Sequence, residues 1–344
     1  MDVAALKKQL SENTPAMVYL ALGTQQILLQ QVRESFIKMI PTEERVMNIG
    51  SYDMETAPLA VALDDAMSTP FFGERRLVII NKPYFLTSEK GPAKMDHDLD
   101  ALSQYLQHPE PSTILVFLAP YDKLDGRKKI VKELKKNAVL VDTSPLNEQS
   151  ARKQIADSLT ADGYTIDPAA MDELVQRTNA DYELMIANLD KLKLLKYKEK
   201  NITVENVKAL VLQSLDENVF DLVNAVLKHE QVKSLDLYDQ LIASEQPPLK
   251  INAVLISQFR LLLQIKILSS RGLSQGTLAQ KLNVHPYRVK LGLQTVRHFS
   301  LPALENAYLG LINIEKALKT TQREPRLLFQ LFMLQYSQQA KATS

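Results

Sequence analysis

The chain has 344 residues, of which 45% are hydrophobic, enough for two or three domains of ordinary size with separate cores. The chain has 41 Lys and Arg residues and 40 Asp and Glu residues, so its net charge is close to zero. A protein that binds nucleic acid by itself is usually more basic. Any DNA contact is therefore local or shared with a partner. The absence of cysteine excludes disulfides, thiolate metal sites and a cysteine nucleophile.

The amino-terminal residues contain no apolar segment of signal-peptide length. The longest apolar run that contains no tyrosine covers residues 114–119. It is far shorter than the roughly 20 residues that span a bilayer. We therefore expect a cytoplasmic protein with no membrane contact.

Residues 1–143 alternate between short apolar runs and segments of helical periodicity. Residues 24–36 and 130–134 show the helical period. Strands that alternate with helices predict βαβ units and an α/β domain with a parallel sheet. The five predicted strands cover residues 17–22, 45–49, 77–80, 114–119 and 138–141.

Strand signals stop after Pro145, and residues 144–213 read as helical throughout. Asp167 is expected to cap a helix whose first turn holds Pro168. Thr203 is expected to cap a later helix. This segment therefore predicts a small helical domain.

Residues 214–344 are again helical, and prolines separate their helices. Residues 249–270 form one long segment with a wide apolar stripe, which predicts a helix buried among neighbours. A last helix is expected to begin at Pro325. This part predicts an all-α bundle.

An α/β domain followed by a small helical domain suggests an ATPase of the AAA+ type, so a phosphate loop is expected after the first strand. That position reads Gly23-Thr24-Gln25-Gln26, with one glycine and no lysine. A working loop needs glycines whose amides converge on phosphate, a lysine, and a Ser or Thr for magnesium. The strand at 77–80 ends in Asn81-Lys82 rather than in the acid that would hold magnesium. We infer an ATPase-like domain that does not use ATP, and expect no bound cofactor.

No other catalytic pattern stands out, so we predict no catalytic residues and no metal ligands. The five histidines lack the spacing of a zinc site. His97, between Asp96 and Asp98, is interpreted as part of a solvated helix start. Asp64 and Asp65 are interpreted as a solvated helix face.

Two clusters of basic residues admit two interpretations. They are either solvated helix faces or contacts to phosphate backbone or an acidic neighbouring subunit. The first comprises Lys123, Arg127, Lys128, Lys129, Lys132, Lys135 and Lys136, and the second Lys191, Lys193, Lys196, Lys198 and Lys200.

Residues 273–299 resemble a helix-turn-helix. Ser274 caps a first helix, 283–286 form the turn, and the second helix carries Arg288, Lys290 and Arg297. This favours an alternative function, a DNA-binding regulator. Two short helices joined by a tight turn also occur in many bundles without any role in DNA binding.

The most informative segment covers residues 67–76, which connect a helix to the strand at 77–80. Phe71 and Phe72 stand between Pro70 and Gly73, two residues that fix a turn. One interpretation places one Phe in the core at the end of the sheet. The other is a hydrophobic wedge presented to a partner's pocket, where two Phe side chains form a binding hot spot.

Taken together, segments along essentially the whole chain resemble the delta subunit family of bacterial DNA polymerase III. Residues 17–23 with 26–29 resemble that family's degenerate phosphate loop, and residues 67–77 resemble its clamp-binding turn. Residues 181–195 resemble its lid helix, and residues 285–287 with 294–297 resemble its collar signature.

The resemblance implies a clamp-loader subunit with three domains: a degenerate AAA+-like module at 1–143, a helical lid at 144–213 and a helical collar at 214–344. The collar would hold it in a five-membered ring with the ATP-hydrolysing tau/gamma subunits and delta prime. The subunit would have no catalysis of its own, although the holoenzyme is a DNA-directed DNA polymerase and hence a nucleotidyltransferase.

The resemblance also implies a partner for the turn. In the family an apolar pair at this position enters a pocket on the beta sliding clamp and favours the open ring, so that the clamp is loaded onto primed DNA. Carried over by position, the clamp-binding residues are Phe71 and Phe72, with Pro70 shaping the turn.

Overall fold

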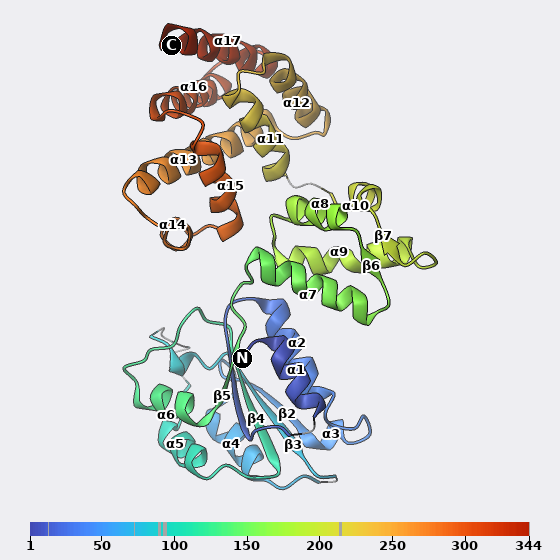
Figure 1. Cartoon of the computed structure of the whole chain (residues 1–344). Helices are drawn as coiled ribbons and strands as arrows, with labels where there is room; N and C mark the ends of the chain where they lie inside the picture. Colours follow the sequence, from blue (N-terminus) through green and yellow to red (C-terminus); the bar gives the residue numbers. More distant parts are fainter. Residues whose placement is uncertain (13, 72, 89–90, 92–94, 213–214, 344) are drawn as a thin grey trace. The chain divides into compact units, whose positions relative to one another are not determined.

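The computed structural model describes residues 1–343 except 13, 72, 89–90, 92–94 and 213–214. The chain forms two compact units, Met1–Pro145 and Leu146–Ser344 (Figure 1). The first unit is α/β and the second is mainly helical, as the sequence predicts.

A five-stranded parallel sheet forms the centre of the first unit. Its order is β2-β3-β4-β1-β5, so β2 and β5 are the edge strands. Each strand pairs in parallel with its neighbours. The strands are β1 (Val18–Leu22), β2 (Ile49–Asp53), β3 (Arg76–Asn81), β4 (Thr113–Ala119) and β5 (Val139–Asp142).

Helices cover both faces of this sheet (Figure 1). The helices α1 (Val3–Ser11) and α2 (Gln26–Ile37) lie on one face, where the ring of Tyr19 packs edge-on at 4.7 Å from that of Phe36. On the other face Leu20 packs in a core with α4, α5 and α6. These helices cover Leu59–Met67, Leu99–Gln107 and Lys129–Asn137. The alternation of side chains along each strand thus fills two cores.

The prediction of a strand at 45–49 is wrong. Arg45–Asn48 form one helical turn, α3, and β2 begins only at Ile49. As an edge strand, β2 is half-buried and carries Gly, Ser and Asp rather than an apolar run. The apolar signal thus pointed to the residues before the strand.

The second unit begins with a small helical part that also contains two short strands. The helices are α7 (Glu148–Ala161), α8 (Pro168–Thr178), α9 (Tyr182–Leu195) and α10 (Val204–Leu210). The expectation of helix throughout is wrong, because β6 (Thr165–Ile166) and β7 (Asn201–Ile202) pair in parallel. Two-residue strands are too short for a periodic signal.

Two predicted helix starts have different outcomes in detail. The helix α8 begins at Pro168 as predicted, but Asp167 makes no side-chain cap and instead accepts a hydrogen bond from Asn201 Nδ2 at 3.3 Å. At α10 the Thr203 cap is confirmed: its backbone N–H donates to Asn206 Oδ1 at 2.9 Å.

The remainder of the second unit is a bundle built around α13 (Pro248–Ser270), which packs against α11, α15 and α16. Ile251, Leu255 and Phe259 lie in its common core. The other helices are α11 (Leu215–Leu227), α12 (Gln231–Ala243), α14 (Gln275–Leu282), α15 (Pro286–Val296), α16 (Leu301–Thr320) and α17 (Pro325–Thr343). The long buried helix and the start at Pro325 are confirmed.

Among the described helices, α13 alone has the length and apolar composition to cross a bilayer. Its apolar residues Ile251, Leu255 and Phe259 are in contact with the other helices of the bundle. Packing within the protein therefore accounts for its composition.

Gly23 directly follows β1, and a substitution there tests how closely its backbone packs against the backbone of Thr143. It has a φ of +149°, and a Cβ there would lie 2.1 Å from the carbonyl carbon of Thr143. Because backbone cannot yield as a side chain can, we expect Gly23→Ala to lower the free energy of unfolding by about 2 kcal/mol or more. Urea denaturation measures this.

The matched control is Gly126→Ala, because nothing lies within 4 Å of a Cβ at Gly126. Its expected effect is within about 0.5 kcal/mol. Equal stability of the two variants would contradict the packing described for Gly23.

Candidate partner-binding site: the turn between α4 and β3

The turn of residues 68–75 joins α4 to the amino end of β3. Arg76 is the first residue of β3, and its N–H donates to Ser112 O, next to the start of β4, at 2.9 Å. In a parallel sheet the amino ends of all strands lie on one side and their carboxyl ends on the other. The turn therefore lies at the amino ends of the strands, opposite to the loop that follows β1.

A polar cluster ties the end of α4 to the start of β3. Asp65 of α4 forms an ion pair with Arg76 and accepts a hydrogen bond from Tyr52 Oη at 2.9 Å. Burial, together with the hydrogen bond to Asp65, raises the pKa of Tyr52 to about 12, so the phenol keeps its proton and continues to donate. Both ends of the turn are thus fixed.

The interpretation of Asp64 and Asp65 as a solvated face holds for one of them. Asp64 is exposed, whereas the Asp65 side chain is only 10% exposed and is bonded on both carboxylate oxygens. The sequence-based expectation for Asp65 is therefore wrong, because its partners come from other strands.

The side chain of Asn48 supports the backbone of the turn at Phe71. It is fully buried at the end of α3, and its Oδ1 accepts a hydrogen bond from the backbone N–H of Phe71 at 2.9 Å. Sequence reasoning missed this residue, since nothing near Asn48 marks it as a partner of a segment 23 residues away.

Gly73 allows the turn to reverse beyond Phe71. Its φ of +75° is in the left-handed region, and a Cβ there would lie 2.1 Å from the Glu44 carboxylate at the start of α3. Glycine meets both demands. The tip therefore contacts α3 at two places, Glu44 and Asn48.

The side chain of Phe71 is presented to solvent. It is 63% exposed, and Met67 at the end of α4 is 56% exposed. Of the two Phe residues, Phe71 is therefore not the one that could lie in the core. Pro70 is half-exposed, and Phe72 lies outside the described residues. What the turn offers is an exposed aromatic ring on a backbone that is held by a buried side chain.

The loop after β1 is closed by main-chain hydrogen bonds. Gly23 N–H donates to Ala119 O at 3.2 Å, and Gln25 N–H donates to Thr143 O at 3.1 Å. At the end of β3, Asn81 accepts from Arg33 at 3.2 Å, and Lys82 forms ion pairs with Asp53 and Glu55. The last residue of β3 and the residue after it thus offer an amide and an ammonium where a magnesium site needs a carboxylate.

Comparison with known proteins decides the family. The family described as DNA polymerase III, delta subunit, matches residues 19–144, and its C-terminal domain matches residues 216–336. The DNA polymerase III subunit delta of Bacillus subtilis (strain 168) is 36% identical over 329 residues, which are 95% of each chain. The chain belongs to the DNA polymerase III delta subunit family.

A solved structure supports this membership. The Bacillus subtilis DNA clamp loader delta protein has 36% sequence identity and a TM-score of 0.75, and the match covers 97% of this delta-family chain and 99% of that one. The similarity therefore extends over the whole chain.

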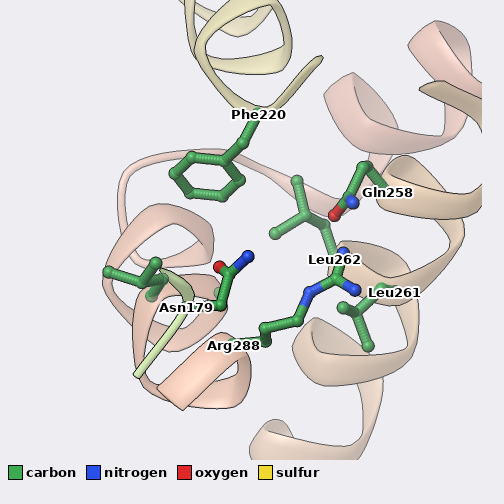
Figure 2. A pocket seen from close by; sticks show the side chains of 8 residues that line it. Asn179, Phe220, Gln258, Leu261, Leu262 and Arg288 are labelled. Carbon is green, nitrogen blue, oxygen red and sulfur yellow. The ribbon is translucent and has the colours of Figure 1, made fainter. Parts of the chain in front are cut away.

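In this delta-family chain the helix-turn-helix forms as predicted, but two of its three basic residues contact other parts of the protein. Figure 2 shows Arg288 of α15 beside Gln258 and Leu262 of α13, lining a cavity of about 20 Å³. Lys290 forms an ion pair with Glu148 of α7 at 2.6 Å. Of the three basic residues named for α15, Arg297 remains exposed. This arrangement argues against base reading by α15.

The two basic clusters are partly engaged in the same way. Arg127 pairs with Asp125 at 2.8 Å, and Lys128 Nζ donates to Phe85 O at 2.8 Å. In the second cluster Lys193 pairs with Asp162 at 2.5 Å. Lys132, Lys135 and Lys136 are exposed on α6, and their contact with phosphate stays a prediction.

His97 has a structural role in the first unit. Its Nδ1 accepts a hydrogen bond from Leu59 N–H at the start of α4, and its Nε2 lies 2.9 Å from Tyr84 Oη. The expectation of a solvated start holds for Asp98, which caps α5, and is wrong for His97. In the described part of the chain, no three His, Asp or Glu side chains gather into a metal-binding group.

The Asn48 contact generates a first prediction for the turn. Asn48→Ala leaves the Phe71 N–H without this acceptor, which we expect to lower stability by roughly 1–3 kcal/mol and to speed exchange of the Phe71 amide. Hydrogen exchange followed by NMR measures this. Met47→Ala, which alters a neighbouring exposed side chain, is the control; unchanged exchange in the Asn48 variant would remove Asn48 as the support.

His97 generates a second prediction, of pH dependence. Burial lowers the pKa of His97 below its usual 6.5, with Met54 O and Asp96 opposing. The unfolded chain therefore takes up this proton first, so the stabilisation is complete above about pH 6.5 and is lost as the pH falls below it. We expect the loss of stability between about pH 7.5 and 5.5 to be smaller in His97→Gln.

Urea denaturation at both pH values measures the difference. The exposed His298→Gln serves as the control and should retain the wild-type dependence. A His97→Gln chain with the wild-type pH dependence would show that His97 titrates as freely in the folded state as in the unfolded state.

Proposed function

We propose that this chain binds the beta sliding clamp through the turn of residues 68–75 and stabilises the clamp's open form for loading onto primed DNA. Phe71 and Phe72 enter the clamp's apolar pocket, and Pro70 shapes the turn. The observation that carries the proposal is the 63% exposed ring of Phe71 on a backbone held by buried Asn48.

Energetics favour this use of the turn. Full burial of one Phe side chain contributes about 1.5–3 kcal/mol, and aromatic side chains at the centre of an interface dominate its affinity. The hydrogen bond to Asn48 and the ion pair at Arg76 already fix the turn, so binding immobilises few additional rotatable bonds and loses little conformational entropy. Most of the free energy gained by burying the ring would therefore contribute to affinity.

Opening of the clamp follows from differential binding. A ligand shifts an equilibrium only if it prefers one state, by about 1.4 kcal/mol for each factor of ten. Tighter binding to the open edge than to the closed ring opens the clamp without nucleotide. ATP hydrolysis then belongs to the partner subunits, in keeping with the amide and ammonium at Asn81 and Lys82.

We further propose the assembly and the division that the family implies. The chain joins tau/gamma and delta prime in the cytoplasm, with an AAA+-like module at 1–143, a lid at 144–213 and a collar at 214–344. The first unit ends at Pro145, and the two family matches leave residues 145–215 between them, in support of this division. The collar mediates the ring.

The direct test is calorimetry of the purified chain with the beta clamp of the same organism. We expect wild type to bind without nucleotide, and Phe71→Ala and Phe72→Ala each to weaken binding by about 2 kcal/mol or more while the fold is retained. The loss should appear chiefly as faster dissociation.

Leu309→Ala is the matched control, since Leu309 is 56% exposed on α16 of the other unit. It should bind as wild type does. Wild-type affinity in both Phe variants would refute the proposal that Phe71 and Phe72 bind the clamp. A sequence-specific DNA footprint from the isolated chain would instead favour the alternative function, a DNA-binding regulator.

A further inference from the structure

The bundle of the second unit carries two adjoining hollows on its surface. One, of about 340 Å³, is lined by Asn218, Asp221, Leu237, Gln240, Leu241 and Ser244. The other, of about 530 Å³, also includes Asp221 and Leu237, together with Lys228, Lys233 and His298. The two hollows therefore form one groove with Asp221 at its middle.

Asp221 has an unusual environment for a carboxylate. It is half-buried on α11, and among the described residues no hydrogen bond or ion pair reaches it. Burial raises its pKa; the charge of Lys233 opposes this and that of Glu173 adds to it. Lys233 itself lies 3.3 Å from Glu230. Lys233 thus acts on this carboxylate through its charge but forms its ion pair with Glu230, and in the described part of the chain no cation pairs with Asp221.

The smaller hollow has the chemistry to receive a cation. Leu237 and Leu241 provide apolar walls, and Asn218, Gln240 and Ser244 provide oxygen acceptors around Asp221. A guanidinium suits this set, because it has five donors in a plane and an apolar stem. Lys228 and Lys233 line only the larger hollow, so their positive charges favour entry of a cation through the smaller one.

We propose that this hollow binds an arginine side chain from the neighbouring clamp-loader subunit. Asp221 pairs with the guanidinium, and Leu237 and Leu241 contact its stem. The inference rests on the proposed function, in which the collar mediates the ring, and adds a specific contact to it. A partner cation supplies the charge that Asp221 lacks within the chain.

The test is the assembly of the full chain with tau/gamma and delta prime, followed by sedimentation velocity. Asp221→Asn should weaken incorporation by about tenfold or more, because one partner of a desolvated charge pair is removed. Clamp binding by the isolated chain should be unchanged. Its melting temperature should be equal or higher, since an amide replaces a charge that burial disfavours.

Asp236→Asn is the control, as Asp236 is exposed on α12 and does not line the groove. It should assemble as wild type does. Gln240→Lys places a cation of the chain's own in the hollow and should also weaken assembly. This second variant decides the matter if Asp221→Asn impairs folding.

Wild-type assembly in Asp221→Asn and Gln240→Lys would overturn the proposal. A wild-type chain that binds the clamp but does not assemble would overturn it together with the proposed role of the collar, and would leave clamp binding intact. A chain that assembles normally and fails only with the clamp would point instead to an error in the wedge.

Discussion

A parallel sheet with helices on both faces is accessible to a partner mainly at the amino ends and at the carboxyl ends of its strands. In this chain the loops at these two ends differ in what they expose. At the carboxyl ends of the strands, main-chain hydrogen bonds join Gly23 to Ala119 at the end of β4 and Gln25 to Thr143 just after β5. At the amino ends, the turn before β3 projects Phe71. The exposed aromatic ring thus lies at the end of the sheet away from the loop that follows β1, and the sheet itself serves as the scaffold.

The two surfaces proposed for binding share a physical property. Phe71 exposes an aromatic ring to water, and Asp221 keeps a carboxylate half-buried without a close counterion. In the proposed complexes, the partner would remove the ring from water and would place a cation beside the carboxylate. Both sites adjoin packed cores, around Leu20 in the sheet and Phe259 in the bundle.

Much of the fold could be predicted from the sequence, because buried strands and the apolar face of α13 give strong periodic signals. Edge strand β2 could not, since all five of its residues are at least partly exposed and Gly, Ser and Asp interrupt its apolar pattern. The strands β6 and β7 are two residues long and carry no period. At the site the turn and Phe71 were evident, whereas Asn48 and the pairing of Asp65 with Arg76 join segments far apart in the chain. Only the folded structure brings those partners together.

The hydrogen bond from Phe71 to Asn48 uses the main-chain N–H and not the ring. Any residue except proline offers the same donor. The support of the turn is therefore indifferent to which side chain stands at its tip. A mutation at position 71 can therefore change the exposed side chain while the backbone geometry of the turn persists. If the turn binds the clamp as proposed, its side chain could co-evolve with the partner's pocket one substitution at a time, without a new fold for each step.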